Sequence, residues 1–179
     1  MDFSIKTIQK SDYSQIDHVV KSAFEQSELG YNGEVEIVHS LRQLSDYDSN
    51  LEIGAYHNNQ LIGMGLLSSG YIETDSQTLN GLILAPVAVD PQYQNQGIGK
   101  QLILELEQRA TNINAAFIHL VGHPNYYQKL GYQPITNWNL TSVLDGPADV
   151  FMIKEITDHP LKEITGGQIH YNEVFEPKK

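Results

Sequence analysis

The segment with the clearest chemical meaning is the polar, glycine-containing stretch from Gln94 to Lys100. A strongly apolar run that ends at Val89 precedes it, and the apolar positions that follow it recur at the spacing of a helix. We therefore expect a buried strand, a short loop and a helix that begins in the loop. The first turn of a helix presents unpaired backbone N–H groups and a partial positive charge, which together favour a bound anion.

Two glycines of this loop, Gly97 and Gly99, lack a Cβ atom, so an anion can come close to the backbone. The loop lacks the Lys-Ser or Lys-Thr pair of a P-loop, and Leu102 stands where the dinucleotide fingerprint has its third glycine. Lys100 is its one cationic side chain. The residues thus predict a pyrophosphate held mostly by backbone groups. The alternative is a plain strand-to-helix turn, in which the glycines serve close packing alone.

The charge of the chain excludes one class of partner. Its 179 residues include 22 acidic and 11 basic side chains, a formal net charge of −11. A general nucleic-acid binder needs a basic face to neutralise phosphates, so we expect no nucleic-acid partner. The acidic surplus lies mainly before Asp90, and the rest of the chain is nearly balanced. This surplus fits a cationic partner, and it equally fits a surface that is charged for solubility.

Residue counts exclude further kinds of site. The sequence has no cysteine, which rules out thiolate metal sites and a cysteine nucleophile. Its seven histidines show no metal-ligand spacing, so we expect no metal. No apolar run approaches the ~18 residues of a membrane span, and the first residues lack the basic start and apolar stretch of a signal peptide. We therefore expect a cytoplasmic protein without a membrane partner.

Short apolar strands alternate with helices along the chain, which predicts an α/β or α+β fold with a mixed sheet. Ser11 is the expected cap of the first helix, Asn58-Asn59 the expected hairpin turn and Gly131 the expected end of a short helix. A polar turn is expected at 71–77, and a last strand or a surface wrap at 166–171. The further helices are expected at 34–44, 98–110 and 125–130, and the strands at 3–8, 51–57, 61–67, 79–89, 115–121, 135–140 and 150–156.

Two blocks of the sequence resemble the GNAT N-acetyltransferase superfamily. The segment from Val87 to Gly99 is similar to its acetyl-CoA loop, in which Arg or Gln precedes Gly-x-Gly or Gly-x-Ala after a Val-x-Pro-x-Tyr strand end. The segment Tyr127-Gln128-Lys129-Leu130-Gly131-Tyr132 is similar to the Tyr-x-x-x-Gly-aromatic element. Longer pieces resemble the YhbS-like branch of predicted N-acetyltransferases, namely Leu84-Ala85-Pro86-Val87-Ala88-Val89, Gly122-His123-Pro124-Asn125-Tyr126-Tyr127, Phe151-Met152, Gly167-x-Ile169-x-Tyr171, and Glu34 ahead of Val38-x-x-Leu41-Arg42.

The resemblance implies one acetyltransferase domain over residues 1–179, with a mixed, largely antiparallel sheet flanked by helices. In that fold two central strands splay apart and the pantetheine arm of acetyl-CoA lies in the gap. Gln94 replaces the commoner Arg of the loop, so it donates hydrogen bonds without charge. The residues that the resemblance assigns to acetyl-CoA are Pro86, Val87, Ala88, Val89, Gln94, Asn95, Gln96, Gly97, Ile98, Gly99, Lys100, Asn125, Tyr126 and Tyr127.

For catalysis, the resemblance implies that Tyr127 protonates the leaving thiolate. The family's usual base is a Glu on the strand that precedes the acetyl-CoA loop, two residues before the position of Val87, and this Glu is replaced here by Ala85. Glu34, His123 and Glu73 are substitute bases, and an amine that loses its proton to solvent needs none. Four of these residues have a structural alternative. Glu34 is then an acid at a helix start and His123 a capping or loop histidine, while Tyr126 and Tyr127 are packed aromatic residues. Asn125 is a cofactor contact or a helix cap.

The function implied by the resemblance is acetyl transfer from acetyl-CoA to a primary amine, on a small molecule or a peptide, by direct attack in a ternary complex. The absence of cysteine agrees with direct attack. The alternative is a non-catalytic acyl-CoA-binding or sensor domain of the same fold, which Ala85 favours and Tyr127 disfavours. Members of the superfamily often form homodimers, so the resemblance makes a homodimer one possible state, and the sequence itself does not determine the oligomeric state.

Overall fold

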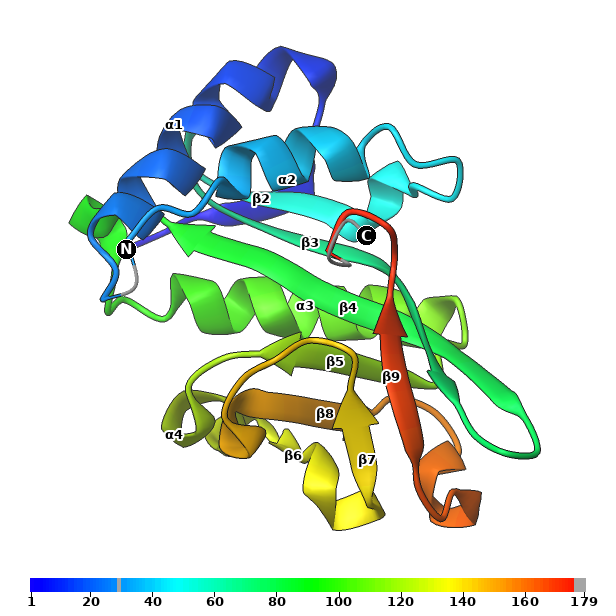
Figure 1. Cartoon of the computed structure of the whole chain (residues 1–179). Coiled ribbons are helices and arrows are strands. Elements are labelled where there is room, and N and C mark those ends of the chain that lie inside the picture. Colours follow the sequence, from blue (N-terminus) through cyan, green and yellow to red (C-terminus); the bar gives the residue numbers. More distant parts are fainter. Residues whose placement is uncertain (29, 176–179) are drawn as a thin grey trace. The chain divides into compact units, whose positions relative to one another are not determined.

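The computed structural model describes residues 1–28 and 30–175 of the chain (Figure 1). Within these residues the elements follow one another as β1 (Ser4–Thr7), α1 (Tyr13–Glu25), α2 (Glu34–Leu41), β2 (Glu52–His57), β3 (Gln60–Glu73), β4 (Thr78–Val89), α3 (Ile98–Asn112), β5 (Phe117–Val121), α4 (Pro124–Tyr127), β6 (Gln133–Pro134), β7 (Leu140–Ser142), β8 (Phe151–Glu155) and β9 (Gly167–Tyr171). Short 3₁₀ helices connect several of them.

The strands form a mixed, largely antiparallel sheet, which confirms the expected fold class. Its order is β1-β2-β3-β4-β5-β8-β6, and β9 pairs with both β3 and β7. The pairs β1–β2, β2–β3, β3–β9, β5–β8 and β6–β8 are antiparallel, while β4–β5 and β7–β9 are parallel. The β4–β5 ladder joins Leu82 to Ile118 and Ile83 to His119.

The chain divides into two compact units. The first comprises Met1–Leu67 and Ala85–Arg109, and the second Ser68–Leu84 and Ala110–Lys179. The strands β3 and β4 pass through both units, so each unit contains part of either strand.

In the first unit, glycines of β3 let α3 pack closely on the sheet. A Cβ atom at Gly63 would lie 3.2 Å from Leu102 Cδ1, and one at Gly65 only 2.9 Å from Leu106 Cδ1. The helix face that includes both leucines is fully buried, as its periodicity predicts. Close packing on β3 therefore fixes the position of α3, and with it the end of the loop that precedes the helix.

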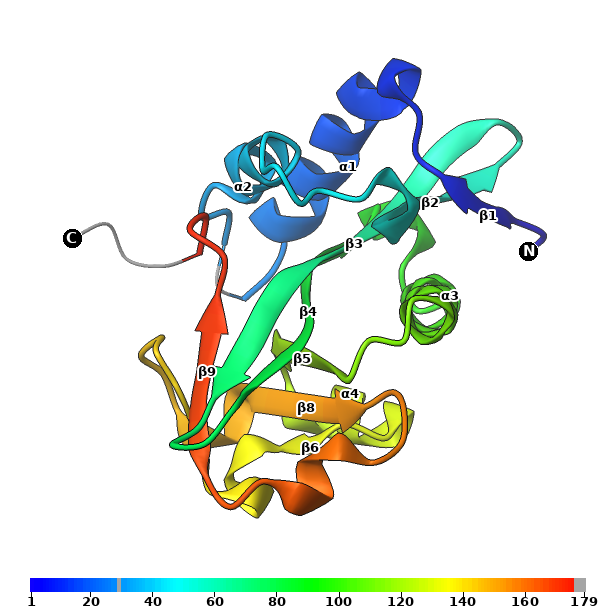
Figure 2. The ribbon, with the colours of Figure 1, turned by 90° about the vertical axis from the view of Figure 1, so that its right-hand side faces the viewer.

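The helices α1 and α2 lie side by side in this unit, where His39 Nε2 is 2.8 Å from Asp17 Oδ1 (Figures 1 and 2). At the end of α2, the Arg42 guanidinium donates to the carboxylate of Glu52 at the start of β2. Their Nη2 and Oε1 atoms are 2.5 Å apart, and both side chains are almost fully buried. The Tyr47 hydroxyl donates to the same carboxylate. Buried charges are tolerated when they are paired and hydrogen-bonded, so this cluster fixes the end of α2 against β2.

A chain of hydrogen bonds with one consistent direction crosses the core of the second unit. The Met152 carbonyl can only accept, so His119 Nδ1 must carry the proton of their 2.8 Å bond. In the neutral ring, which the complete burial of His119 favours, Nε2 accepts from the Tyr171 hydroxyl at 2.7 Å, and Tyr171 in turn accepts from Ser142 at 2.8 Å. Ser142 Oγ accepts the Leu144 N–H. The chain joins β5, β7, β8 and β9.

Four expectations about elements were wrong. Ser11 lies in a 3₁₀ turn, and Asp12 takes the N-cap of α1. The second helix ends at Leu41 instead of residue 44. Strand β3 runs on to Glu73, where β9 pairs with it, so the turn predicted over 71–77 covers only 74–77. The predicted strand 135–140 is a 3₁₀ helix that ends at the left-handed Asn139, and Leu140 begins β7.

Burial lowers the pKa of His119 from 6.5 to about 4. Between these two values the unfolded chain binds a proton that the folded chain does not, so the free energy of unfolding falls as the pH falls through this window. We expect a loss of about 3 kcal/mol from this group, measured by urea unfolding at a series of pH values.

The variant His119→Asn keeps a donor for Met152 but cannot titrate, so its unfolding free energy should depend less on pH than that of the wild type. If the pH dependence of the unfolding free energy is the same in His119→Asn as in the wild type, His119 is not its source.

Candidate functional site

The loop between β4 and α3 has the geometry expected from its sequence. The Asp90 carboxylate accepts the Gln92 N–H at 2.9 Å and caps a 3₁₀ turn over Pro91–Tyr93. Asn95 and Gly97 then take left-handed conformations, with φ of 61° and 82°. The first helical bond of α3 runs from Gln101 N–H to the Gly97 carbonyl. The unpaired N–H groups at the start of α3 therefore follow directly on a loop of alternating backbone handedness, an arrangement that forms anion-binding nests.

The space above this loop is open at Gly97. A Cβ atom built there would find no other atom within 4 Å. The side chain of Gln94 has a local role, because its Nε2 donates to the Val89 carbonyl at 3.0 Å and closes the loop onto the end of β4. The open space at Gly97 and the N–H groups of the first turn of α3 are therefore compatible with a bound phosphate group, whereas part of the Gln94 amide already binds the backbone.

The end of β4 alternates between buried and half-buried positions. Pro86 and Ala88 are buried, while Ala85, Val87 and Val89 are half-buried. All five residues lie beyond the ladder that joins β4 to β5. Ala85 has no ionisable group, so the described strand offers no base at this position.

The element after β5 brings the predicted aromatic residues together within the second unit. Pro124–Tyr127 forms α4, a 3₁₀ turn over Gln128–Leu130 follows, and Gly131 ends it at a φ of 91°, as expected. The ring of Tyr127 meets those of Tyr126 and Tyr132 edge-on, at centroid distances of 5.0 and 5.8 Å. Burial raises the pKa of Tyr127 to about 12, so the phenol keeps its proton at neutral pH.

Several residues on the segment 121–126, next to Tyr127, are more exposed than a packed core would make them, although Tyr132 is buried. Tyr126 is 42% exposed and Asn125 is also exposed. His123 occupies the N-cap position of α4, but its side chain makes no capping hydrogen bond. Val121, expected inside a buried strand, is 51% exposed at the end of β5. Sequence reasoning missed Val121, since its apolar type gives no signal of exposure at a strand end.

The candidate bases have different surroundings. Glu34 opens α2 in the first unit, and its carboxylate accepts the Asn32 N–H at 2.8 Å, so it has a local role at the helix start. His123 lies in the second unit, on the same short element as Tyr127. Glu73, also in the second unit, has Oε2 3.3 Å from His170 Nε2.

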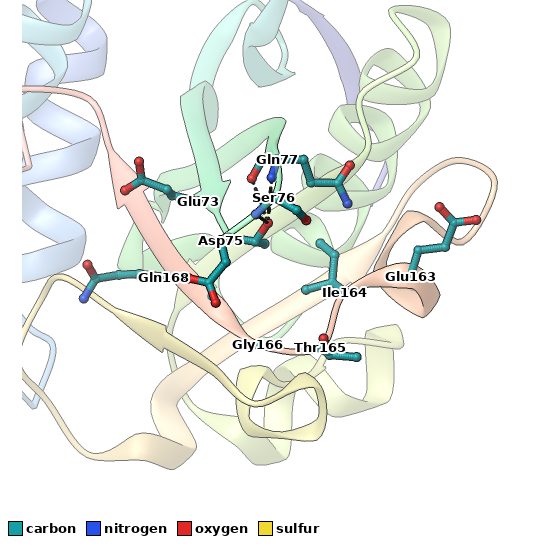
Figure 3. A pocket seen from close by; sticks show the side chains of 11 residues that line it. Glu73, Asp75, Ser76, Gln77, Glu163, Ile164, Thr165, Gly166 and Gln168 are labelled. Carbon is teal, nitrogen blue, oxygen red and sulfur yellow. Dashed lines mark hydrogen bonds between the residues drawn. The ribbon is translucent and has the colours of Figure 1, made fainter.

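A hollow of about 570 Å³ lies in the second unit, lined by residues of the β3–β4 turn and of the segment that leads into β9. Figure 3 shows the side chains that line it. Its lining includes the carboxylates of Glu73, Asp75 and Glu163 and no Lys or Arg side chain. Glu73 is the one candidate base among the lining residues, and the residues assigned to the cofactor lie elsewhere. The residues that line the hollow thus include none from the β4–α3 loop or from α4.

Two kinds of feature are absent from the described residues, 1–28 and 30–175. They contain no group of three or more His, Cys, Asp or Glu side chains that could hold a metal ion. None of their helices combines the length and the apolar character that crossing a membrane requires.

Comparisons with known proteins agree on one relationship. A family model described as "Acetyltransferase (GNAT) domain" matches residues 50–134. YhbS of Escherichia coli (strain K12), an uncharacterized N-acetyltransferase, is 26% identical over 167 residues, which are 92% of this chain and 93% of YhbS. YjhQ of the same strain, also an uncharacterized N-acetyltransferase, is 30% identical over 74% of this chain and 70% of its own length.

Solved structures give the same answer for the fold. The crystal structure of YhbS from Escherichia coli in complex with CoA aligns with a TM-score of 0.83 at 25% identity, covering 97% of this chain and 91% of that one. A GNAT family acetyltransferase from Brucella melitensis, in complex with acetyl-CoA, aligns with a TM-score of 0.76 at 23% identity, covering 98% and 99%.

Proposed function

Because the chain belongs to the GNAT family of N-acetyltransferases, we propose that it transfers the acetyl group of acetyl-CoA to a primary amine. The observation that carries this proposal is the loop of alternating handedness with open space at Gly97, followed at once by the N-terminus of α3. The complex of YhbS with CoA supports the choice of ligand. The proposal takes residues 1–179 as one acetyltransferase domain. A cytoplasmic location and a homodimer stay predictions.

Acetyl-CoA, when bound, supplies the thioester that an amine attacks. The residues that would hold its pyrophosphate are those of the loop from Gln94 to Lys100, through backbone N–H groups and the dipole of α3. The half-buried strand end with Val87 and Val89 would hold the pantetheine arm by backbone pairing, a form of strand addition. The exposed side chains of Asn125 and Tyr126 are available for further contacts.

Tyr127 is proposed as the general acid. A leaving thiolate needs a proton, and a phenol with a pKa of about 12 carries one across the whole physiological range. Its position beside Tyr132 and Tyr126 keeps the ring in one place. The packed-aromatic alternative does not account for the partial exposure of this element.

His123 is proposed as the base, or as the residue that passes the proton of the amine to water. It lies on the same short element as Tyr127, and an imidazole is the side chain most often used for general acid–base proton transfer. Glu34 is the weaker candidate because its carboxylate already binds the Asn32 N–H. With Ala85 in place of the family's Glu, the third route is an amine that enters after losing its proton to solvent.

The acceptor is proposed to be a cationic amine on a small molecule or a peptide. The acidic surplus before Asp90 supports this choice, since it would attract a protonated amine. A direct attack in a ternary complex agrees with the absence of cysteine, because no thiol can carry an acetyl group between substrates.

A panel of primary amines with thiol release as the readout tests the function. Acceptor-dependent release of CoA from acetyl-CoA supports transfer. The sensor alternative, which Ala85 favours, predicts that acetyl-CoA raises the melting temperature while no amine accelerates thiol release. If millimolar acetyl-CoA neither raises the melting temperature nor releases thiol with any amine, both functions are excluded.

Gly97→Ala should weaken the binding of acetyl-CoA about tenfold or more. The new methyl group fills the space proposed for the phosphate and strains a backbone with a φ of 82°. Isothermal titration with acetyl-CoA measures the loss. Gly30→Ala is a matched control, because Gly30 has a similar φ of 72° and equally open surroundings. Equal affinities in the two variants would contradict the proposed phosphate site.

Tyr127→Phe should lower kcat about 100-fold, the low end of what general acid–base catalysis contributes, and leave the affinity for acetyl-CoA within about twofold. Because the raised pKa keeps the phenol protonated, the wild-type kcat should show no fall due to Tyr127 until about one unit below pH 12. Steady-state kinetics over a pH series measure both effects. A kcat that survives the substitution would remove Tyr127 as the acid.

A further inference from the structure

Gly122 is the first residue after β5, and its missing side chain leaves the room that the ring of Tyr127 occupies. A Cβ atom built at Gly122 would collide with Tyr127 Cε2 and would lie 2.9 Å from Tyr127 Cδ2. A separation under 3.0 Å requires one of the two groups to shift. An alanine at position 122 therefore displaces either its own backbone or the tyrosine ring.

The backbone at Gly122 is held in place. Its N–H donates to the Val150 carbonyl at 2.9 Å, and the preceding strand β5 is paired along its length with β8. On the side chain's own side, Leu120 Cδ1 would be the next atom, at 3.3 Å. The φ of Gly122 lies outside the left-handed region, so an alanine can adopt this backbone without strain. The conflict with Tyr127 is purely steric.

The ring of Tyr127 is confined by aromatic neighbours. Tyr132 is 1% exposed and meets the ring edge-on, and its N–H donates to the Tyr127 carbonyl at 3.2 Å. Tyr126 packs edge-on against it at 5.0 Å. The Tyr127 N–H donates in turn to the His123 carbonyl. With the backbone tied and two rings adjacent, an added methyl group forces the Tyr127 ring to rotate and moves its hydroxyl.

We propose that Gly122 is a positioning residue for acetyl transfer, which places the Tyr127 hydroxyl by leaving the space that its ring fills. The inference rests on the proposed role of Tyr127 as general acid. It predicts that a single methyl group at position 122 acts on the reaction through the phenol, without touching substrate. A donor displaced by about 1 Å can lower a rate about 100-fold, so the effect is large enough to measure.

Kinetics of Gly122→Ala, Tyr127→Phe and the double variant test the proposal. Gly122→Ala should lower kcat by about 10- to 100-fold, with the KM for acetyl-CoA within about twofold. In the Tyr127→Phe background the same substitution should change kcat by less than about twofold, because no hydroxyl remains to be displaced. Equal losses in both backgrounds would overturn the proposal.

Gly146→Ala is the matched control for the kinetic experiment. Its Cβ atom would also meet an aromatic ring in the same unit, that of Phe151 at 3.1 Å, and Gly146 too lies outside the left-handed region. We expect its kcat to stay within about twofold of the wild type. A loss as large as that of Gly122→Ala would show that any tightened aromatic contact suffices, and would overturn the specific role.

A stability cycle tests the geometry without using activity. The unfolding free energy that Gly122→Ala costs should be substantially smaller in the Tyr127→Leu background, because the ring that the methyl group meets is gone. If Gly122→Ala fails to fold alone but folds with Leu at position 127, the steric assignment is supported. If it fails in both backgrounds, or costs the same in both, the assignment is wrong.

The two experiments separate this inference from the proposed function. If Tyr127→Phe retains the full kcat, the acid role fails, and with it the claim that Gly122 supports catalysis, while the stability cycle still decides whether Gly122 places the ring. If Tyr127→Phe is impaired and the two substitutions show no coupling in either experiment, the acid role stands and the positioning role of Gly122 fails.

Discussion

The parallel pairing of β4 with β5 is the constraint from which the arrangement of the chain follows. Antiparallel neighbours need a turn of two residues, but parallel neighbours need a crossover of a dozen or more, and here α3 provides it. A helix that must begin soon after the carboxyl end of β4 needs a tight reversal, which Asn95 and Gly97 supply through left-handed backbone. The anion-binding geometry of the loop is thus a by-product of how two parallel strands are connected.

Features that depend on neighbouring residues could be predicted from the sequence. The left-handed pair Asn58 and Asn59, the glycine at the end of the turn after α4, and the buried face of α3 all follow from short-range spacing. Gly97 belongs with them, since a glycine between a strand and a helix indicates a tight reversal of the backbone. The assignment of individual residues to acetyl-CoA depends on family resemblance, and remains a prediction.

Features that depend on distant residues could not be predicted. The segment 71–77 is predominantly polar, which predicts a turn, and the strand that pairs with its first residues lies about a hundred positions later. The three-residue chain of His119, Tyr171 and Ser142 leaves no pattern in the sequence, since its members come from three strands. The exposure of Val121 and the space beside Gly122 are likewise properties of packing. An apolar residue and a glycine look the same in sequence whether or not a ring lies next to them.

The pairing of β9 with β3 has a consequence for the synthesis of the chain. Asn172, just after β9, donates to Ser68 Oγ across 104 positions, and the ladder beside it covers Gly70 to Glu73. At ribosomal rates of about 5–20 residues per second, this edge of β3 emerges about 5–20 s before its partner strand exists. During that interval an unpaired strand edge is open to pairing with other nascent chains. The late synthesis of β9 thus leaves this part of β3 without its partner strand on the nascent chain.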